Sequence, residues 1–337
     1  MTLIESPQAT PELPARSLAS RVGRRTASIL GRYGALIALA VLLIIFSIAS
    51  PYFLTIPNLL QVLNQSALGA IVAGGLTLVL ASGQFDLSIG YMASLSGIIV
   101  TILMLQGVPI PVAILIALLA GVIVGVVNGF LVTVLQVNAL VATLGTGSVL
   151  IGVNYFISGG TPQPVSTEFP EFLQIAIGSW FGIPKPVFYM AAALLILWVV
   201  LNKTDFGRNL RATGGNTEAA KLAGVRTARV TTAAFVVAAL FAAITGVLLA
   251  SSIGSGQPTG GDNYTLSSFA AAFLGSTVLR EGQFHILGTL VGVVTVAVGF
   301  NGLALVGVPS FVQFLFQGIL LIAAVAFSSI GRRLSKE

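Results

Sequence analysis

NKTDFGRNLRATGGNTEAAKLAGVRTARV, residues 202–230, is a long polar segment between two apolar runs, and this contrast decides the fold class. It contains six of the sixteen lysines and arginines of the chain: Lys203, Arg208, Arg211, Lys221, Arg226 and Arg229. Short loops rich in these residues stay in the cytoplasm and orient a membrane protein. We therefore expect residues 202–229 to form a cytoplasmic loop between two membrane helices.

Part of this loop has the sequence pattern of a short helix. The predicted helix comprises Gly215, Asn216, Thr217, Glu218, Ala219, Ala220, Lys221, Leu222, Ala223 and Gly224. Asn216 or Thr217 is a suitable N-cap, and Gly224 can end the helix. Glu218 in the first turn and Lys221 in the last turn complement the helix dipole.

One face of this predicted helix is apolar, with Ala219, Leu222 and Ala223 side by side. An isolated helix of about two turns is marginal in water, because helix nucleation is costly. We therefore expect the helix to dock against another surface. The alternative is a solvated connector between two membrane helices.

The composition indicates an all-α integral membrane protein. Apolar residues make up 56% of the 337 residues, charged residues only 8%, and the mean hydropathy is +1.01. Soluble domains carry roughly 25% charged residues. The net charge of +6 does not indicate nucleic-acid binding, because the basic residues lie in short loops and at the termini. With no cysteine and one histidine, His285, we expect no metal site.

About ten apolar runs approach the ~20 residues that a transmembrane helix needs. They are 33–50, 59–82, 87–105, 111–135, 140–157, 187–201, 230–253, 266–279, 286–306 and 311–330. Residues 33–330 thus form the predicted transmembrane domain. Residues 1–32 are predicted to be a disordered cytoplasmic tail, and residues 331–337 a cytoplasmic C-terminal tail.

The distribution of positive charge supports this division. With the N terminus inside, fifteen of the sixteen basic residues lie on the cytoplasmic side, and only Lys185 lies outside. The apolar run at 266–279 is short, and near Gly83 only a few polar residues separate two apolar runs. A broken or re-entrant helix is therefore an alternative at either place. The external loop 158–186 is rich in proline and aromatic residues, which fits either a short interfacial helix or a stiff linker.

Asp86, in GQFDLSIG at 83–90, is the only acidic residue between Arg32 and Glu168. An ionisable group beside apolar helices is a functional candidate. Asp86 and Ser88 are also suited to cap the helix predicted to begin at Leu87. Both roles, a helix cap and part of a solute path, remain open.

Polar side chains within the apolar runs supply further candidates. The candidates for a translocation path or gate are Asn64, Gln65, Asp86, Ser88, Asn128, Asn138, Thr143 and Asn301. Such groups either hydrogen-bond a solute in a pore or connect neighbouring helices. Gly121, Gly125 and Gly129 recur every four residues and predict close helix packing. The tripeptide Gly-Gln-Phe occurs at 83–85 and at 282–284, which is too short to establish a repeat.

Four segments, in order, resemble the permease subunits of bacterial ABC importers for ribose, galactose, xylose and similar solutes. Residues 83–90 resemble the family's Gly-Gly-x-Asp-Leu-Ser-Val-Gly, and 214–224 its Gly-x-Asn-x-x-Ala-Ala-(Arg/Lys)-x-(Ser/Ala)-Gly helix. Asn128-Gly129 with 143–146 resembles its Asn-Gly and Thr-Leu-Gly-Thr segments, and 301–303 its late Asn-Gly-Leu. The resemblance runs from about Ile37 to Ile330.

This resemblance implies a type II-like importer permease in the bacterial cytoplasmic membrane, with both termini inside. It implies that residues 215–224 are the coupling helix, inserted into a groove of a cytoplasmic, tandem two-domain ABC ATPase. It also implies a second permease copy or paralogue and an external binding protein that delivers a monosaccharide or similar small polar solute. ATP and Mg would then be bound by the ATPase, so the chain would be no enzyme and hold no cofactor.

Two other classes of function are weighed against this one. A secondary transporter or channel works without an ATPase; Asp86 favours it, and the lack of other charges within the runs opposes it. A membrane-embedded enzyme is disfavoured, because the sequence contains neither HExxH nor GxSxG, and no glycine precedes a lysine as in a nucleotide-binding loop.

Overall fold

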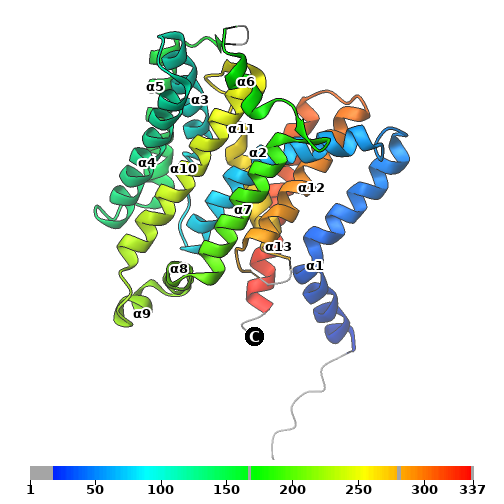
Figure 1. Ribbon diagram of the computed structural model, residues 1–337. Coiled ribbons are helices and arrows are strands. Elements are labelled where there is room, and N and C mark those ends of the chain that lie inside the picture. The colour runs from blue at the N-terminus through cyan, green and yellow to red at the C-terminus, as the bar shows by residue number, and fades with distance from the viewer. Residues whose placement is uncertain (1–17, 166–167, 279–281, 335–337) are drawn as a thin grey trace, which may run out of the picture.

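Long apolar helices run between two ends of the molecule, one marked by α6 and the other by α8 and α9 (Figure 1). The computed structural model describes residues 18–165, 168–278 and 282–334. The apolar helices are α1 (Leu18–Ala49), α2 (Ile56–Ala81), α3 (Ile89–Leu105), α4 (Ile110–Thr133), α5 (Ala139–Ser158), α7 (Lys185–Lys203), α10 (Thr227–Ile253), α11 (Asn263–Gly275), α12 (Ile286–Leu305) and α13 (Phe311–Leu334). Each predicted span coincides with one of these helices.

Six of the described helices are long and apolar enough to cross a membrane. One prediction needs correction. The N-terminal segment is not disordered up to residue 32, because α1 already begins at Leu18. Its arginines are good helix formers and continue the helix that follows. The tail residues 1–17 and 335–337 and the loop residues 279–281 lie outside the described part of the chain.

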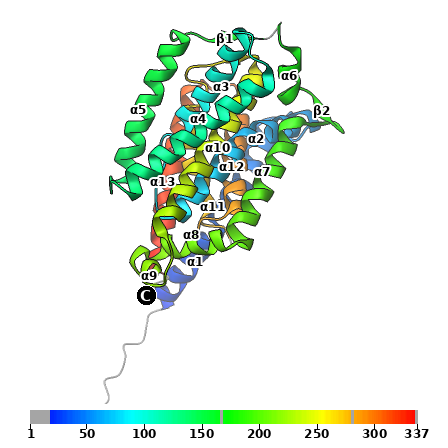
Figure 2. The ribbon, with the colours of Figure 1, turned by 60° about the vertical axis from the view of Figure 1, so that its left-hand side comes forward.

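The helices divide into an inner and an outer set. Inside the bundle, α2, α10 and α12 have 78%, 67% and 67% of their most apolar stretch buried, whereas α4 and α5 have 28%. Figure 2 shows α5 at the outer edge. Large apolar side chains point outward from the outer helices, for example Ile123 of α4 and Phe156 of α5. Such surfaces suit contact with lipid chains.

The predicted glycine ridge packs α4 against α10. A Cβ on Gly125 would lie 2.4 Å from the Cα of Val236, and one on Gly121 would lie 2.9 Å from the carbonyl oxygen of Ala239. Gly129 meets Thr232 in the same way. Only glycine permits such close backbone approach, so the ridge acts in helix packing, as the four-residue spacing predicted.

The shortest apolar helix, α11, is preceded by a non-helical segment, residues 254–262, that folds back against α3. At 13 residues, α11 is only about 20 Å long, less than the ~30 Å of a hydrocarbon core. Ser94 of α3 donates to Asp262 Oδ1 (2.8 Å) and accepts from the Gly261 N–H (2.9 Å). The predicted span at 266–279 is therefore the broken helix that its length allowed.

The loop between α5 and α7 contains the short helix that its sequence allowed, α6 (Pro170–Ala176). Phe172 of α6 is buried, and the hydroxyl of Ser251 donates to its carbonyl (2.6 Å) and accepts from the Ala176 N–H (3.0 Å). The two-residue strand β1 (Gln163–Pro164) pairs with β4 (Ser255–Gly256). A short hairpin joins β2 (Ser179–Trp180) to β3 (Ile183–Pro184). This loop caps the end of α10.

A glycine substitution in α4 tests the packing. We expect Gly125→Ala to lower the thermal unfolding midpoint, with a loss of about 1–3 kcal/mol, because backbone atoms of α10 occupy the space. Gly152→Ala in α5 is the control, since its Cβ meets nothing within 4 Å. It should be neutral or stabilising by about 0.5–1 kcal/mol. Equal losses in both variants would contradict this packing.

Candidate functional site

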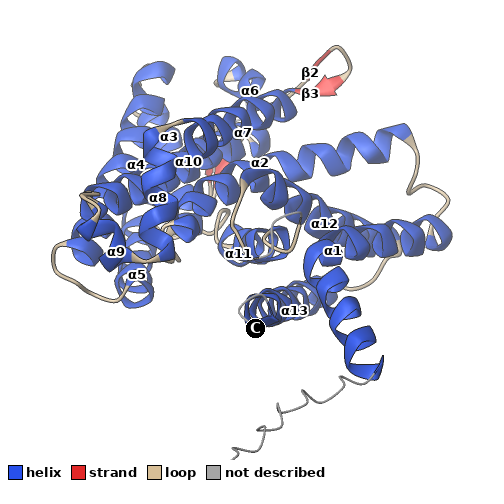
Figure 3. Ribbon diagram, turned by 90° about the horizontal axis from the view of Figure 1, so that it is seen from below, coloured by secondary structure: helices blue, strands red, loops and turns tan. Residues whose placement is uncertain are grey.

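The polar segment at 202–230 folds into two helices at one end of the bundle. They are α8 (Asp205–Gly215) and α9 (Thr217–Leu222), and Figure 3 shows them from that end. Thr204 caps α8 by accepting from the Gly207 N–H, and Asn216 caps α9 by accepting from the Ala219 N–H (3.0 Å). The predicted helix and its Asn216 cap are therefore present. The preceding helix α8 was not predicted.

The apolar face predicted for α9 points away from the bundle. Leu222 is 91% exposed, Ala219 and Ala223 are also exposed, and Ala220 is buried against the rest of the chain. Gly224 has φ +85°, which ends the helix in the left-handed region that glycine adopts easily. The element is thus fixed on one side and presents an apolar surface on the other.

Helix α8 lies directly on the end of α2. A Cβ on Gly214 would lie 2.1 Å from the carbonyl oxygen of Ala81, and one on Gly83 would lie 3.5 Å from the Gly214 Cα. By contrast, a Cβ on the neighbouring Gly215 would meet nothing within 4 Å. Glycine at these positions therefore lets the backbone of α8 lie directly against the end of α2 and the loop that follows it.

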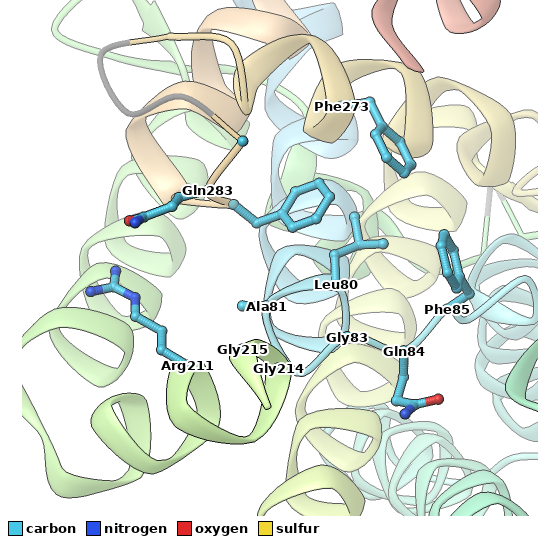
Figure 4. A pocket seen from close by; sticks show the side chains of 12 residues that line it. Leu80, Ala81, Gly83, Gln84, Phe85, Arg211, Gly214, Gly215, Phe273 and Gln283 are labelled. Atoms are coloured by element: carbon cyan, nitrogen blue, oxygen red, sulfur yellow. The ribbon is translucent and has the colours of Figure 1, made fainter. Parts of the chain in front are cut away.

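That loop and the Gly-Gln-Phe loop before α12 line one cavity of about 400 Å³, which we call the twin-loop cavity (Figure 4). Its walls are residues 83–85, residues 282–284, the end of α8 at 214–215, and Leu80, Ala81, Arg211 and Phe273. Gly83 and Gly282 both have positive φ, +80° and +72°. The Gly-Gln-Phe tripeptide, although too short to establish a repeat, thus marks two loops that each contain a positive-φ glycine and line the same cavity.

Four phenylalanines connect the two loops. Phe85 stacks on Phe269 (6.1 Å between ring centroids) and on Phe273 (6.4 Å), and Phe273 meets Phe284 edge to face (5.3 Å). Phe269 and Phe273 lie one turn apart on α11. Sequence reasoning missed this cluster, and the only signal for it was the repeated Gly-Gln-Phe.

Four of the eight path candidates form a single network around the turn at 86–88. Asp86 is fully buried, and its Oδ1 accepts from the Ser88 N–H (2.9 Å) and the Ser88 hydroxyl (2.6 Å). Asn128 donates to the Ser88 hydroxyl (2.9 Å), and Thr143 accepts from the Leu87 N–H (3.1 Å). Helix α3 begins at Ile89 rather than at Leu87, because this turn precedes it.

Asp86 forms a local turn with Ser88 and does not cap α3, because no described side chain makes a capping hydrogen bond at the start of this helix. The prediction that Asp86 and Ser88 cap the helix is therefore wrong. The second carboxyl oxygen of Asp86, Oδ2, has no hydrogen-bond partner among the described residues. Asp86 lies between α2 and α3, and it lines neither the twin-loop cavity nor the cavity between α2, α11 and α12.

The other four candidates lie in three places. Asn138 caps α5 by accepting from the Leu140 N–H. Asn301 and Asn58 form a reciprocal amide pair, at 2.9 and 3.0 Å, that joins α12 to α2. Asn64 and Gln65 line a second cavity, of about 350 Å³, between α2, α11 and α12.

The lone histidine is part of the structure of the α12 turn. Its Nδ1 accepts from the Gly288 N–H (2.9 Å), so the neutral ring carries its proton on Nε2, which donates to the Val278 carbonyl (2.7 Å). Within the described residues no group of three or more His, Cys, Asp or Glu side chains is placed to hold a metal ion.

An all-α bundle with buried polar networks and cavities between its helices is typical of multi-pass membrane permeases. Comparison with known proteins agrees. The family described as "Branched-chain amino acid transport system / permease component" matches residues 58–325. The chain belongs to this family of permease components.

Individual relatives cover most of the chain. It is 38% identical to the ribose import permease protein of Bacillus subtilis (strain 168), over 88% of this chain and 92% of that protein. It is 36% identical to the L-arabinose transport system permease protein of Escherichia coli (strain K12), over 88% and 90%. It is 34% identical to a probable ABC transporter permease protein of the same organism, over 87% of each. No solved structure matches.

Substitutions at Asp86 test its role in the turn with Ser88. Asp86→Asn keeps an oxygen acceptor for Ser88 and removes the charge. We therefore expect its thermal stability to stay close to that of the wild type.

Asp86→Ala removes the acceptor as well, and we expect a loss of about 1–3 kcal/mol because the buried Ser88 N–H loses its partner. Glu171→Gln, at an exposed acid in α6, is the control and should not change the stability. Equal stability of the Asn and Ala variants would contradict a structural role of this turn contact.

Proposed function

We propose that the chain is the membrane permease of an ATP-driven sugar importer in the bacterial cytoplasmic membrane, with the α8–α9 end facing the cytoplasm. The apolar face of α9 is the observation that carries this proposal. A solvated connector has no reason to hold Leu222 91% exposed on a capped and anchored helix. A groove in a cytoplasmic ATPase would cover that face.

The distribution of charge supports the orientation. The α8–α9 end carries Lys203, Arg208, Arg211, Lys221, Arg226 and Arg229, whereas Lys185 lies at the other end. Short loops with this bias remain cytoplasmic. Both described chain ends lie at the α8–α9 end (Figure 1), so they would face the cytoplasm in the proposed orientation.

The contact between α8 and α2 supplies a path for mechanical coupling. Gly214 touches the Ala81 carbonyl, Ala81 is followed by the loop 83–85, and Phe85 packs on α11. When ATP closes the ATPase pair, α9 moves with its groove and α8 pushes on this loop. The four-phenylalanine cluster then opens or closes the cytoplasmic side of the pathway.

The remaining parts of the machine come from other chains. A tandem two-domain ATPase binds ATP and Mg, a second permease copy or paralogue completes the pathway, and an external binding protein delivers the solute at the α6 end. The relatives named for ribose and L-arabinose support a monosaccharide as the solute. This chain itself carries out translocation and no hydrolysis.

Uptake measurements test the proposal. In proteoliposomes holding the permease, its ATPase and its binding protein, we expect uptake of labelled D-ribose or L-arabinose only with ATP. Leu222→Asp should abolish both this uptake and co-purification of the ATPase, because it places a charge in an apolar contact. Its thermal stability should be unchanged, since the side chain is exposed.

Phe181→Asp is the matched control, because Phe181 is 98% exposed at the opposite end of the molecule. It should leave ATPase co-purification unchanged. Uptake driven by an ion gradient without the ATPase would contradict the proposal and favour a secondary transporter. Normal ATPase association of Leu222→Asp would rule out α9 as the docking element.

Neighbouring glycines in α8 test the coupling path. We expect Gly214→Ala to reduce the sugar transported per ATP hydrolysed, because its Cβ would meet the Ala81 carbonyl and displace α8 from the loop. Gly215→Ala should behave as wild type, since its Cβ meets nothing. The measurement is the ratio of uptake to ATPase rate, with complex assembly checked by co-purification. Equal ratios in the two variants would exclude this contact as the transmission point.

A further inference from the structure

The cavity between α2, α11 and α12 has one polar wall and one apolar wall. Asn64 and Gln65 of α2 and Tyr264, Ser267 and Ser268 of α11 supply the polar atoms. Val293, Val296, Ala297 and Phe300 of α12 form the apolar wall, together with Leu68. Its volume of about 350 Å³ is at the lower end of the ~300–1,000 Å³ range of small-molecule pockets.

Ser268 is the unusual residue of this cavity. It is 1% exposed, and its hydroxyl has no hydrogen-bond partner among the described residues. Other helix hydroxyls of the chain donate to the carbonyl four residues earlier, as Ser66 does to Val62 and Ser267 does to Asn263. Ser268 therefore keeps both its donor and its acceptor available, at the cost of an unsatisfied buried group.

Gln65 is the second unusual residue. It is exposed on an apolar helix long enough to cross a membrane. A primary amide facing lipid would lose its hydrogen bonds to water without compensation. An exposed Gln65 beside an unsatisfied Ser268 therefore indicates a space that holds water or a polar molecule.

The charge of the lining restricts what that molecule can be. The eleven lining residues include no Asp, Glu, Lys or Arg. A zwitterionic amino acid would leave its ammonium and carboxylate groups unpaired here. A neutral molecule with several hydroxyls and one apolar face fits both walls, since its hydroxyls match the amides and Ser268 and its C–H face matches Phe300 and Tyr264.

We propose that this cavity is a contact site for a neutral polyhydroxylated solute, a monosaccharide in the size range of a pentose, during passage through the membrane. The proposal rests on the proposed import function and adds where this chain touches the solute. Asn64, Gln65 and Ser268 hydrogen-bond its hydroxyls, and Phe300 packs against its ring. The family description names branched-chain amino acids, and the uncharged lining excludes them at this site.

The absence of cysteine from the chain allows a direct test. In the full complex with its ATPase and binding protein, Gln65→Cys and Ser268→Cys each introduce the only thiol of this permease. We expect a charged, membrane-impermeant methanethiosulfonate to modify Gln65→Cys. D-Ribose or L-arabinose should slow this reaction severalfold, and should slow any reaction of Ser268→Cys to the same degree. Leucine should not slow either reaction. Glu171→Cys, at an exposed position of α6, is the control and should react at a rate that sugar does not change.

Removal of the Ser268 hydroxyl gives a second, independent readout. We expect Ser268→Ala to raise the unfolding midpoint, because an unsatisfied buried group is lost, and to lower maximal sugar uptake about threefold to tenfold. A merely structural serine would not raise stability and lower uptake together. Ser148→Ala should alter neither.

The outcomes separate this inference from the proposed function. If the wild-type complex shows no ATP-dependent sugar uptake, the proposed function itself fails. If the wild type imports sugar but Ser268→Ala does so equally well and sugar protects neither cysteine, only the site is wrong. Protection by leucine, or an unreactive Gln65→Cys in every nucleotide state, would also overturn the site.

Discussion

A backbone amide or carbonyl that leaves a helix at membrane depth must find its partner inside the protein, because lipid offers none. Helix α3 meets this requirement for two non-helical segments. Its first turn begins at the Asp86–Ser88 turn, where Ser88 donates to the buried carboxylate. Residues 254–262 lie against the side of α3, where Ser94 accepts from the Gly261 N–H and donates to the Asp262 carboxyl. Thr265 at the start of α11 accepts from the Gly90 N–H of α3. Small and hydroxylated residues on α3 therefore make the broken helices possible.

The break before α11 has a mechanical consequence. Because α11 begins inside the bundle, this one short helix lines both cavities. Tyr264 and Ser268 near its start line the cavity between α2, α11 and α12, and Phe273 near its end lines the twin-loop cavity. A full-length helix would be anchored at both surfaces. A half-length helix held by hydroxyl contacts and aromatic stacking is a better candidate for a part that moves between two arrangements.

Local sequence patterns predicted what depends on local physics. The apolar runs located the helices, Asn216 was found as a cap, and the spacing of Gly121, Gly125 and Gly129 predicted the packing of α4. Contacts between distant segments were not predictable in this way. The hydrogen bond between Thr77 and Thr289 joins residues 212 positions apart, and the meeting of loops 83–85 and 282–284 is equally remote. Hydropathy also averages over a break such as residues 254–262, so it registered only a short span.

The eight polar candidates looked alike in sequence, and their hydrogen bonds distinguish them. Asn301 is fully engaged with Asn58, Asn138 caps its own helix, and Asp86 is held by Ser88, so each contributes mainly to the fold. Binding requires a polar atom whose hydrogen bonds inside the protein are incomplete. One oxygen of Asp86 also lacks a partner among the described residues, but Asp86 lines neither of the two cavities. Ser268, which was not among the candidates, has a hydroxyl unpaired within the described part of the chain and lines the same cavity as the exposed Gln65. In a membrane helix, a polar residue is therefore a candidate for solute binding when one of its polar atoms lacks a hydrogen-bond partner inside the protein and faces a cavity.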